Sequence, residues 1–177
     1  MRLAKNTFFL MLLSLVIFSG CKKDNEGGES PAENGTIQAT VEGSSFKSVK
    51  IATSATKTTA QGTTTLMIQG NTGGQDAKAI VITIIGFEGK GVYKFGEQMV
   101  PIVTGSYSEI KIDLDNPNNP EIKFWTAPYE DSGVAGKIEV TKLSETNIEG
   151  VFNFKAKNND DGSFKTVNSG SFNIDFK

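Results

Sequence analysis

The sequence predicts an all-β protein: an antiparallel β-sandwich or flattened β-barrel of about ten short strands, with little or no helix. Three observations support this fold class. Short runs rich in β-branched and aromatic residues recur at near-regular spacing, separated by clusters of Gly, Asn, Asp and Pro. Several of these runs alternate apolar with polar residues. No window shows a sustained helical period with caps, so we expect one short helix at most.

The expected strands follow one another along the chain with turn residues between them. They cover residues 36–42, 46–53, 63–69, 79–87, 92–95, 107–114, 121–126, 137–142, 147–157 and 170–176. The expected turns lie at residues 42–44, 70–75, 88–91, 116–120, 131–133 and 158–162.

Two of these strands show a clear alternation. In 147–157 the apolar residues are Ile148, Phe152, Phe154 and Ala156, and polar residues such as Asn153 lie between them. In the last strand Phe172, Ile174 and Phe176 alternate in the same way. Since successive side chains of a strand point to opposite faces, each strand has one buried and one wet face. We predict that they form a hairpin through the 158–162 turn.

The run from Ala79 to Ile85 is apolar on both faces. Such a run is typical of a central strand that is covered on both sides. We therefore expect it in the middle of a sheet, with the opposite sheet on one face and a loop or neighbouring strand on the other.

The N-terminal residues have the composition of an export leader. Arg2 and Lys5 precede an apolar run at 8–18, which only Ser14 interrupts, and the small pair Ser19-Gly20 follows. The run is shorter than the roughly 20 residues that span a bilayer, which argues against an uncleaved membrane helix. The segment Phe18-Ser19-Gly20-Cys21 resembles the lipobox of bacterial lipoproteins, with Phe18 where Leu is usual. The resemblance implies cleavage before Cys21 and acylation of its thiol; the alternative is a free thiol, which invites disulfide formation in an oxidising compartment.

The chain divides into three parts on this interpretation: a signal peptide at 1–20, a flexible tether at 21–35 and one all-β domain at 36–177. The tether contains no large apolar side chain after Cys21. Its residues 22–26 are similar to the charged signal that sends lipoproteins of Bacteroidota to the outer face of the outer membrane. We expect an outer-membrane protein at the cell surface, with a periplasm-facing anchor as the alternative.

Composition argues against most kinds of catalysis. The chain has no His, Arg2 is its single Arg, and Cys21 is its single Cys. The exported part therefore lacks the usual general base of neutral pH and the guanidinium that grips phosphates. The formal net charge of −2 makes nucleic acid an unsuitable partner. We expect a protein that is not an enzyme and uses no cofactor, although a hydrolase with paired carboxylates stays open.

Two sets of residues are candidates for a binding site. Trp125 and Tyr129 lie in an aromatic cluster that can stack on a sugar or line a ligand mouth, or can fill the core. Trp125 and Phe124 are expected on opposite faces of one strand. The Asp113/Asp115 and Asp160/Asp161 loops offer oxygen ligands suited to calcium, but they lack the spacing of a specific calcium loop and contain ordinary turn residues, so we predict no metal site.

The order of several short motifs resembles an uncharacterised domain family of Bacteroidota lipoproteins. The motifs are the segment 35–43 with Phe46, then 66–70, Gly86, 91–93, 136–141, 148–154 and 170–172. The resemblance implies the location and the fold and carries no activity. We expect a non-catalytic binding or structural surface module, for a glycan, a host protein or an envelope component. The alternatives are a lipocalin-like carrier of a small apolar ligand and a carboxylate-pair glycoside hydrolase.

Overall fold

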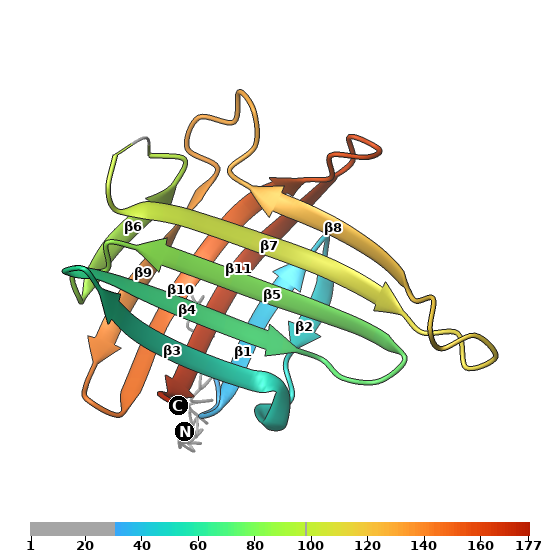
Figure 1. Ribbon diagram of the computed structural model, residues 1–177, viewed down its shortest axis with the longest axis horizontal. Coiled ribbons are helices and arrows are strands. Elements are labelled where there is room, and N and C mark those ends of the chain that lie inside the picture. The colour runs from blue at the N-terminus through green and yellow to red at the C-terminus, as the bar shows by residue number, and fades with distance from the viewer. Residues whose placement is uncertain (1–30, 98) are drawn as a thin grey trace, which may run out of the picture.

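The computed structural model describes residues 31–97 and 99–177, and the regular secondary structure of these residues is almost entirely β-strand (Figure 1). The strands are β1 (Thr36–Val41), β2 (Ser44–Lys47), β3 (Thr53–Ala60), β4 (Thr63–Asn71), β5 (Asp76–Ile85), β6 (Gly91–Phe95), β7 (Ile102–Lys111), β8 (Glu121–Ala127), β9 (Gly136–Leu143), β10 (Asn147–Lys157) and β11 (Phe164–Asp175). One short 3-10 helix, η1 (Lys50–Ala52), precedes β3.

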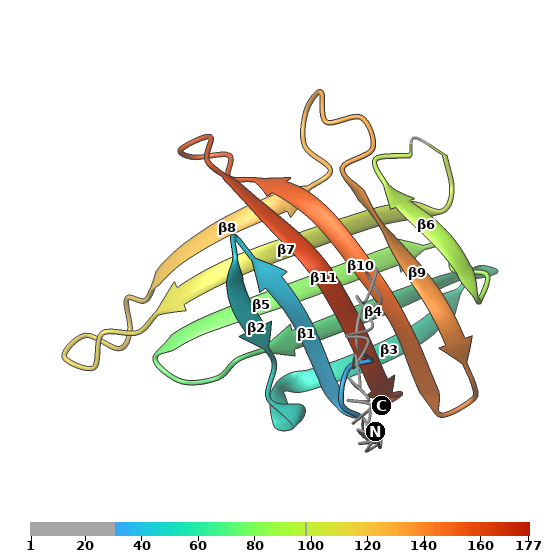
Figure 2. The same ribbon diagram turned by 180° about the vertical axis from the view of Figure 1, so that it is seen from behind.

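All eleven strands belong to one antiparallel sheet in the order β2-β1-β11-β10-β8-β7-β5-β4-β3, with β9 also beside β10 and β6 beside β9. Strand β10 meets β8 only at Lys157, which pairs with Thr126, whereas it pairs with β9 and β11 over most of its length. The sheet therefore folds over at this corner into two layers. We call β3, β4, β5, β7 and β8 the five-stranded layer, and β2, β1, β11, β10, β9 and β6 the six-stranded layer. The strands of the two layers cross at a steep angle (Figures 1 and 2).

One hydrophobic core fills the space between the layers. Alternate residues of each strand reach it, as Ile80, Ile82 and Ile84 of β5 do. Its largest fully buried side chains are aromatic: Phe46, Phe95, Tyr107, Phe152, Phe154 and Phe172. This arrangement confirms the predicted all-β class and the antiparallel sandwich-like architecture with almost no helix.

Strands β10 and β11 form the predicted hairpin, and its aromatic rings lie over glycines. Phe152 pairs with Gly170, and Gly150 pairs with Phe172 on the neighbouring strand. A Cβ atom on Gly170 would lie 2.6 Å from the Phe152 ring, and one on Gly150 would lie 2.5 Å from the Phe172 ring. Glycine at both positions therefore lets each ring cover the opposite backbone, as in aromatic rescue of strand glycines.

Several predicted strand boundaries were wrong, for identifiable reasons. The expected strand 46–53 is divided by η1, and β3 was missed because its Ser and Thr residues give no apolar alternation. Strand β7 begins at Ile102 instead of residue 107. Strand β11 begins at Phe164 instead of residue 170, because the pairing with β10 shifts between Phe152 and Phe154 and changes the phase of the buried positions after Val167.

Strand β5 lies in the middle of the five-stranded layer, as predicted, between β4 and β7. The expected cover on its second face is absent among the described residues: Ala79, Val81 and Thr83 are half-buried and Ile85 is 40% exposed. Side chains of β4 and β7 flank them within the same face, and this lateral contact takes the place of a covering layer.

The domain begins before the expected boundary at residue 36. Ala32 is buried, Glu33 forms ion pairs with Lys47 at 3.0 Å and with Lys50 at 2.6 Å, and the Gly35 amide donates to the Asn173 carbonyl. Residues 32–35 are thus docked on the sheet and do not belong to a flexible tether. Cys21 and the expected signal peptide lie outside the described residues. Within the described ranges, no helix has the length and apolar character needed to cross a membrane.

Candidate functional site

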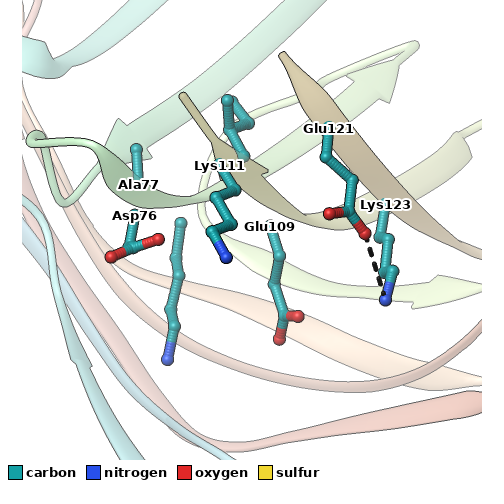
Figure 3. A pocket seen from close by; sticks show the side chains of 8 residues that line it. Asp76, Ala77, Glu109, Lys111, Glu121 and Lys123 are labelled. Atoms are coloured by element: carbon teal, nitrogen blue, oxygen red, sulfur yellow. Dashed lines mark ion pairs between the residues drawn. The ribbon is translucent and has the colours of Figure 1, made fainter. Parts of the chain in front are cut away.

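The charged side chains of β5, β7 and β8 gather at one end of the core-facing side of the five-stranded layer. They are Asp76 and Lys78 on β5, Glu109 and Lys111 on β7, and Glu121 and Lys123 on β8. Figure 3 shows most of them projecting from the same side of the strands. They line an open groove of about 290 Å³, which we call the charged groove. A second hollow continues from Lys111 and Glu121 over the loop that follows β7.

The pairing of the strands gives the charged groove an alternating pattern of charge. Asp76 lies opposite Lys111, which lies opposite Glu121. In the next row Lys78 lies opposite Glu109, which lies opposite Lys123. Each charge therefore has neighbours of the opposite sign across the strands, and the groove as a whole is close to neutral.

Lys165 of β11 reaches across from the six-stranded layer to Glu109, which lines the charged groove. Its Nζ donates to Glu109 Oε1 at 2.9 Å and lies 4.9 Å from the centre of the Trp125 ring. The Tyr107 hydroxyl donates to the same Glu109 oxygen at 3.0 Å. Burial and the carboxylate of Glu109 raise the pKa of Tyr107, so its phenol stays a neutral donor.

Glu109 is held in its ionised form. Burial by itself would raise the pKa of Glu109, but the hydrogen bonds from Lys165 and Tyr107 and the positive charge of Lys165 outweigh this effect. The pKa of Glu109 therefore lies below its ordinary value. Glu109 is a fixed negative charge and cannot serve as a proton donor near neutral pH.

The other charged side chains of the groove take part in fewer ion pairs and hydrogen bonds than Glu109 does. Within the described part of the chain, Glu121 and Lys123 form an ion pair at 3.4 Å, and Asp76, Lys78 and Lys111 form none. Asp76 and Lys111 are also exposed to solvent. These side chains can thus meet a ligand without first breaking an ion pair.

Trp125 and Tyr129, the residues singled out from the sequence, do not line the charged groove. Trp125 is 3% exposed, and its Nε1 donates to Ser163 Oγ at 3.0 Å, so the indole fills the core beside Tyr107. Phe124 is 50% exposed, which confirms that it and Trp125 point to opposite faces. Tyr129 is half-buried and packs edge-on against Phe164. A ligand-binding role for Trp125 and Tyr129 stays a prediction.

The acidic loops use their oxygens to shape turns. Asp113 Oδ1 accepts from the Asp115 amide at 3.0 Å, and Asp161 Oδ1 accepts from the Ser163 amide at 2.8 Å. In the residues that the structure describes, no three His, Cys, Asp or Glu side chains come together as a metal-binding group.

The charged groove was missed in the sequence, although a signal is present. The pattern of an acid, one residue and a lysine occurs five times in the chain, and three of these segments lie within β5, β7 and β8: Asp76-Ala77-Lys78, Glu109-Ile110-Lys111 and Glu121-Ile122-Lys123. In a strand this spacing places both charges on one face. What brings the three repeats together is the antiparallel order β5-β7-β8, which the repeats alone do not specify.

Comparison with curated proteins and with solved structures finds no significant match. A family described as a domain of unknown function (DUF6252) matches residues 33–174, a span that extends from the docked Glu33 to Ile174 in β11. That span includes all the charged-groove residues named above and nearly all of the sheet, and the chain belongs to this family, DUF6252.

Proposed function

We propose that this protein is a lipid-anchored outer-membrane protein of Bacteroidota type that acts as a non-catalytic binding module at the cell surface. The leader, the lipobox-like segment ending at Cys21 and the polar residues after it support the anchor. The described chain enters the sheet beside its own C-terminus, since Thr36 pairs with Asn173 (Figure 2). A tether at that end leaves the two layers free to project from the membrane.

The charged groove is the proposed ligand site, and the observation that carries this proposal is a set of side chains of both signs that form no ion pair with any other described residue. Asp76, Lys78 and Lys111 sit beside a solvent-open hollow. A ligand that carries positive and negative groups close together can pair with them, whereas a strongly acidic or basic polymer would meet repulsion from half of the groove. A mixed-charge segment of a polypeptide has this chemistry. A neutral glycan does not.

The state of Glu109 supports binding in preference to hydrolysis. A carboxylate-pair glycosidase needs one carboxylic acid that is protonated at working pH. Lys165 and Tyr107 hold Glu109 as a carboxylate, with its pKa lowered. The proposed module therefore uses its carboxylates to pair with cationic groups.

Neutralising two charges of the groove is expected to weaken binding of mixed-charge peptides about fivefold, because each lost surface ion pair contributes up to about 1 kcal/mol. The variant is Asp76→Asn with Lys111→Gln, which leaves the net charge unchanged. Its matched control is Lys137→Gln with Glu139→Gln, which removes an ion pair from the six-stranded layer. Fluorescence anisotropy of labelled peptides with alternating Lys and Glu measures the effect, beside all-Lys, all-Glu and uncharged peptides. Equal binding of all four peptides, or equal loss in both variants, would contradict the groove assignment.

The filled interior supports a surface site over a lipocalin-like carrier. Phe95, Tyr107, Phe152 and Phe154 occupy the space between the layers, and each is at most 2% exposed. We expect no saturable binding of fatty acids or of an apolar dye to the native protein, measured by dye fluorescence and by the melting temperature. Stoichiometric uptake of one such probe with a raised melting temperature would favour the carrier instead.

A further inference from the structure

The outer face of the five-stranded layer carries no charged side chain. Pairing of the strands sets out the outward-pointing residues in five rows: Thr58-Thr65-Ile85-Ile102, Thr56-Met67-Thr83-Thr104, Ser54-Gln69-Val81-Ser106-Thr126, Asn71-Ala79-Ser108-Phe124 and Ala77-Ile110-Ile122. None of them is Asp, Glu, Lys or Arg. We call this surface the uncharged face; it is the front of the molecule in Figure 1.

This absence of charge is specific to one surface. The charged residues of β5, β7 and β8 all point to the core-facing side, and so does Lys57 of β3, whose Nζ lies 5.4 Å from the centre of the Phe176 ring. The six-stranded layer has the ordinary arrangement: its outer side carries Lys137 with Glu139, and Lys142 with Glu149 at 2.8 Å. Composition therefore does not explain the uncharged face, because one fifth of the chain is charged.

The uncharged face also presents large apolar side chains to solvent. Ile122 is 58% exposed and Phe124 is 50% exposed at one end, while Ile102 is 43% exposed at the other. Small hydroxyl residues such as Thr104 and Ser106 lie between the two apolar ends. Depletion of charge and enrichment of apolar residues are the marks of the central part of a protein interface, where a charge would lose its hydration without gaining a partner.

The size of the uncharged face suits a modest dimer. Five strands about 4.8 Å apart, and the length of β5 from Ala77 to Ile85 at about 3.3 Å per residue, give a face of about 24 by 26 Å. Two such faces in contact would cover about 1,200 Å² in total, which is at the lower end of the range for specific protein interfaces.

We infer that the uncharged face binds the same face of a second copy of this chain. The strand residues of two uncharged faces meet without charge repulsion, and the nearest lysines, Lys177 beside Ser54 and Lys157 beside Thr126, lie at the rim. A membrane surface or a charged protein would instead lose hydration of its own charges against the face. In such a face-to-face pair the two-fold axis lies in the contact plane. A two-fold axis in this plane can place the N-terminal ends of both copies on the same side of the dimer. The charged groove opens on the other side of the layer and stays accessible in the dimer.

The test is the mass of the full chain, purified in detergent, by sedimentation equilibrium over a range of concentrations. Thr104 is exposed on the uncharged face, so Thr104→Lys places a charge there without disturbing the core. Thr141 is exposed on β9 of the six-stranded layer, and Thr141→Lys is the matched control. We expect a concentration-dependent dimer for the natural chain, Thr104→Ser and Thr141→Lys, and dissociation at least about tenfold greater for Thr104→Lys.

Thermal unfolding of each variant, followed by circular dichroism, shows whether Thr104→Lys is folded. If it is not, Ser106→Lys at the neighbouring position replaces it. A natural chain that is monomeric at all concentrations overturns the inference. So does equal dimerisation of Thr104→Lys and Thr141→Lys. Binding of the monomeric chain to a neutral polysaccharide or to lipid vesicles, lost in Thr104→Lys, would also overturn it by assigning the uncharged face to another partner.

Discussion

Replacing Phe154 with alanine is expected to lower the free energy of unfolding by about 3 to 5 kcal/mol. The Phe154 ring is 2% exposed, and its centre lies 5.2 Å from that of Phe95 and 6.2 Å from that of Phe152. These rings come from β6 and β10, so the cavity would open where the six-stranded layer packs its aromatic side chains together. A loss of this size is a large part of the stability of a domain of this length.

Asn153→Ala is the control for Phe154→Ala. Asn153 is the neighbouring residue, points to the outer side of β10 and is half-buried. Surface substitutions of this kind change stability by about 0.5 kcal/mol or less. Urea and thermal denaturation of both variants give the comparison. Equal melting temperatures would show that the two faces of β10 were assigned wrongly.

Replacing Cys21 with serine is expected to remove the protein from the membrane. On the proposed anchor, acyl chains on the Cys21 thiol bind the bilayer at about 0.8 kcal/mol per buried methylene, and several chains together make release negligible. Serine offers no thiol to acylate. The variant should therefore stay unprocessed or appear in the soluble fraction, as measured by fractionation, immunoblotting and intact mass.

A second variant distinguishes the loss of the acylated thiol from the effect of any substitution near the cleavage position. Ser19→Ala keeps a small residue before the cleavage position and should leave the protein in the membrane fraction. If Cys21→Ser is still cleaved at the same site and still sediments with membranes, lipidation is not the anchor.

Strands with an apolar period were predictable from the sequence, and those without it were not. Strand β10 was placed at its correct bounds because Ile148, Phe152 and Phe154 alternate with polar residues. Strand β3 was missed because both of its faces are rich in Ser and Thr. The first half of β11 was missed because the irregularity opposite Phe152 and Phe154 shifts its period. The local alternation of apolar and polar residues thus predicts which side chains are buried, but it does not predict which distant strand pairs with which.

Prediction of the candidate site required knowledge of strand pairing to a greater extent than prediction of the strands did. The three acid-x-lysine segments of the groove lie on strands separated by up to 45 positions in the chain, between Asp76 and Glu121. Lys165, which binds Glu109 in the groove, comes from the other layer. For Trp125 the sequence left two alternatives open, a ligand site and the core, and the indole is part of the core.

The alternating charges of the groove have a consequence for how the five-stranded layer assembles. Strand β5 is apolar on both faces, so hydrophobic burial distinguishes poorly between alternative alignments of its neighbours. A slip of two residues between β5 and β7 would set Lys78 against Lys111, or Asp76 against Glu109. The same slip between β7 and β8 would set Lys111 against Lys123, or Glu109 against Glu121. Like charges directly opposite one another are destabilising. The charged residues at the ends of these strands therefore disfavour shifted registers during folding, whatever ligand they bind in the folded protein.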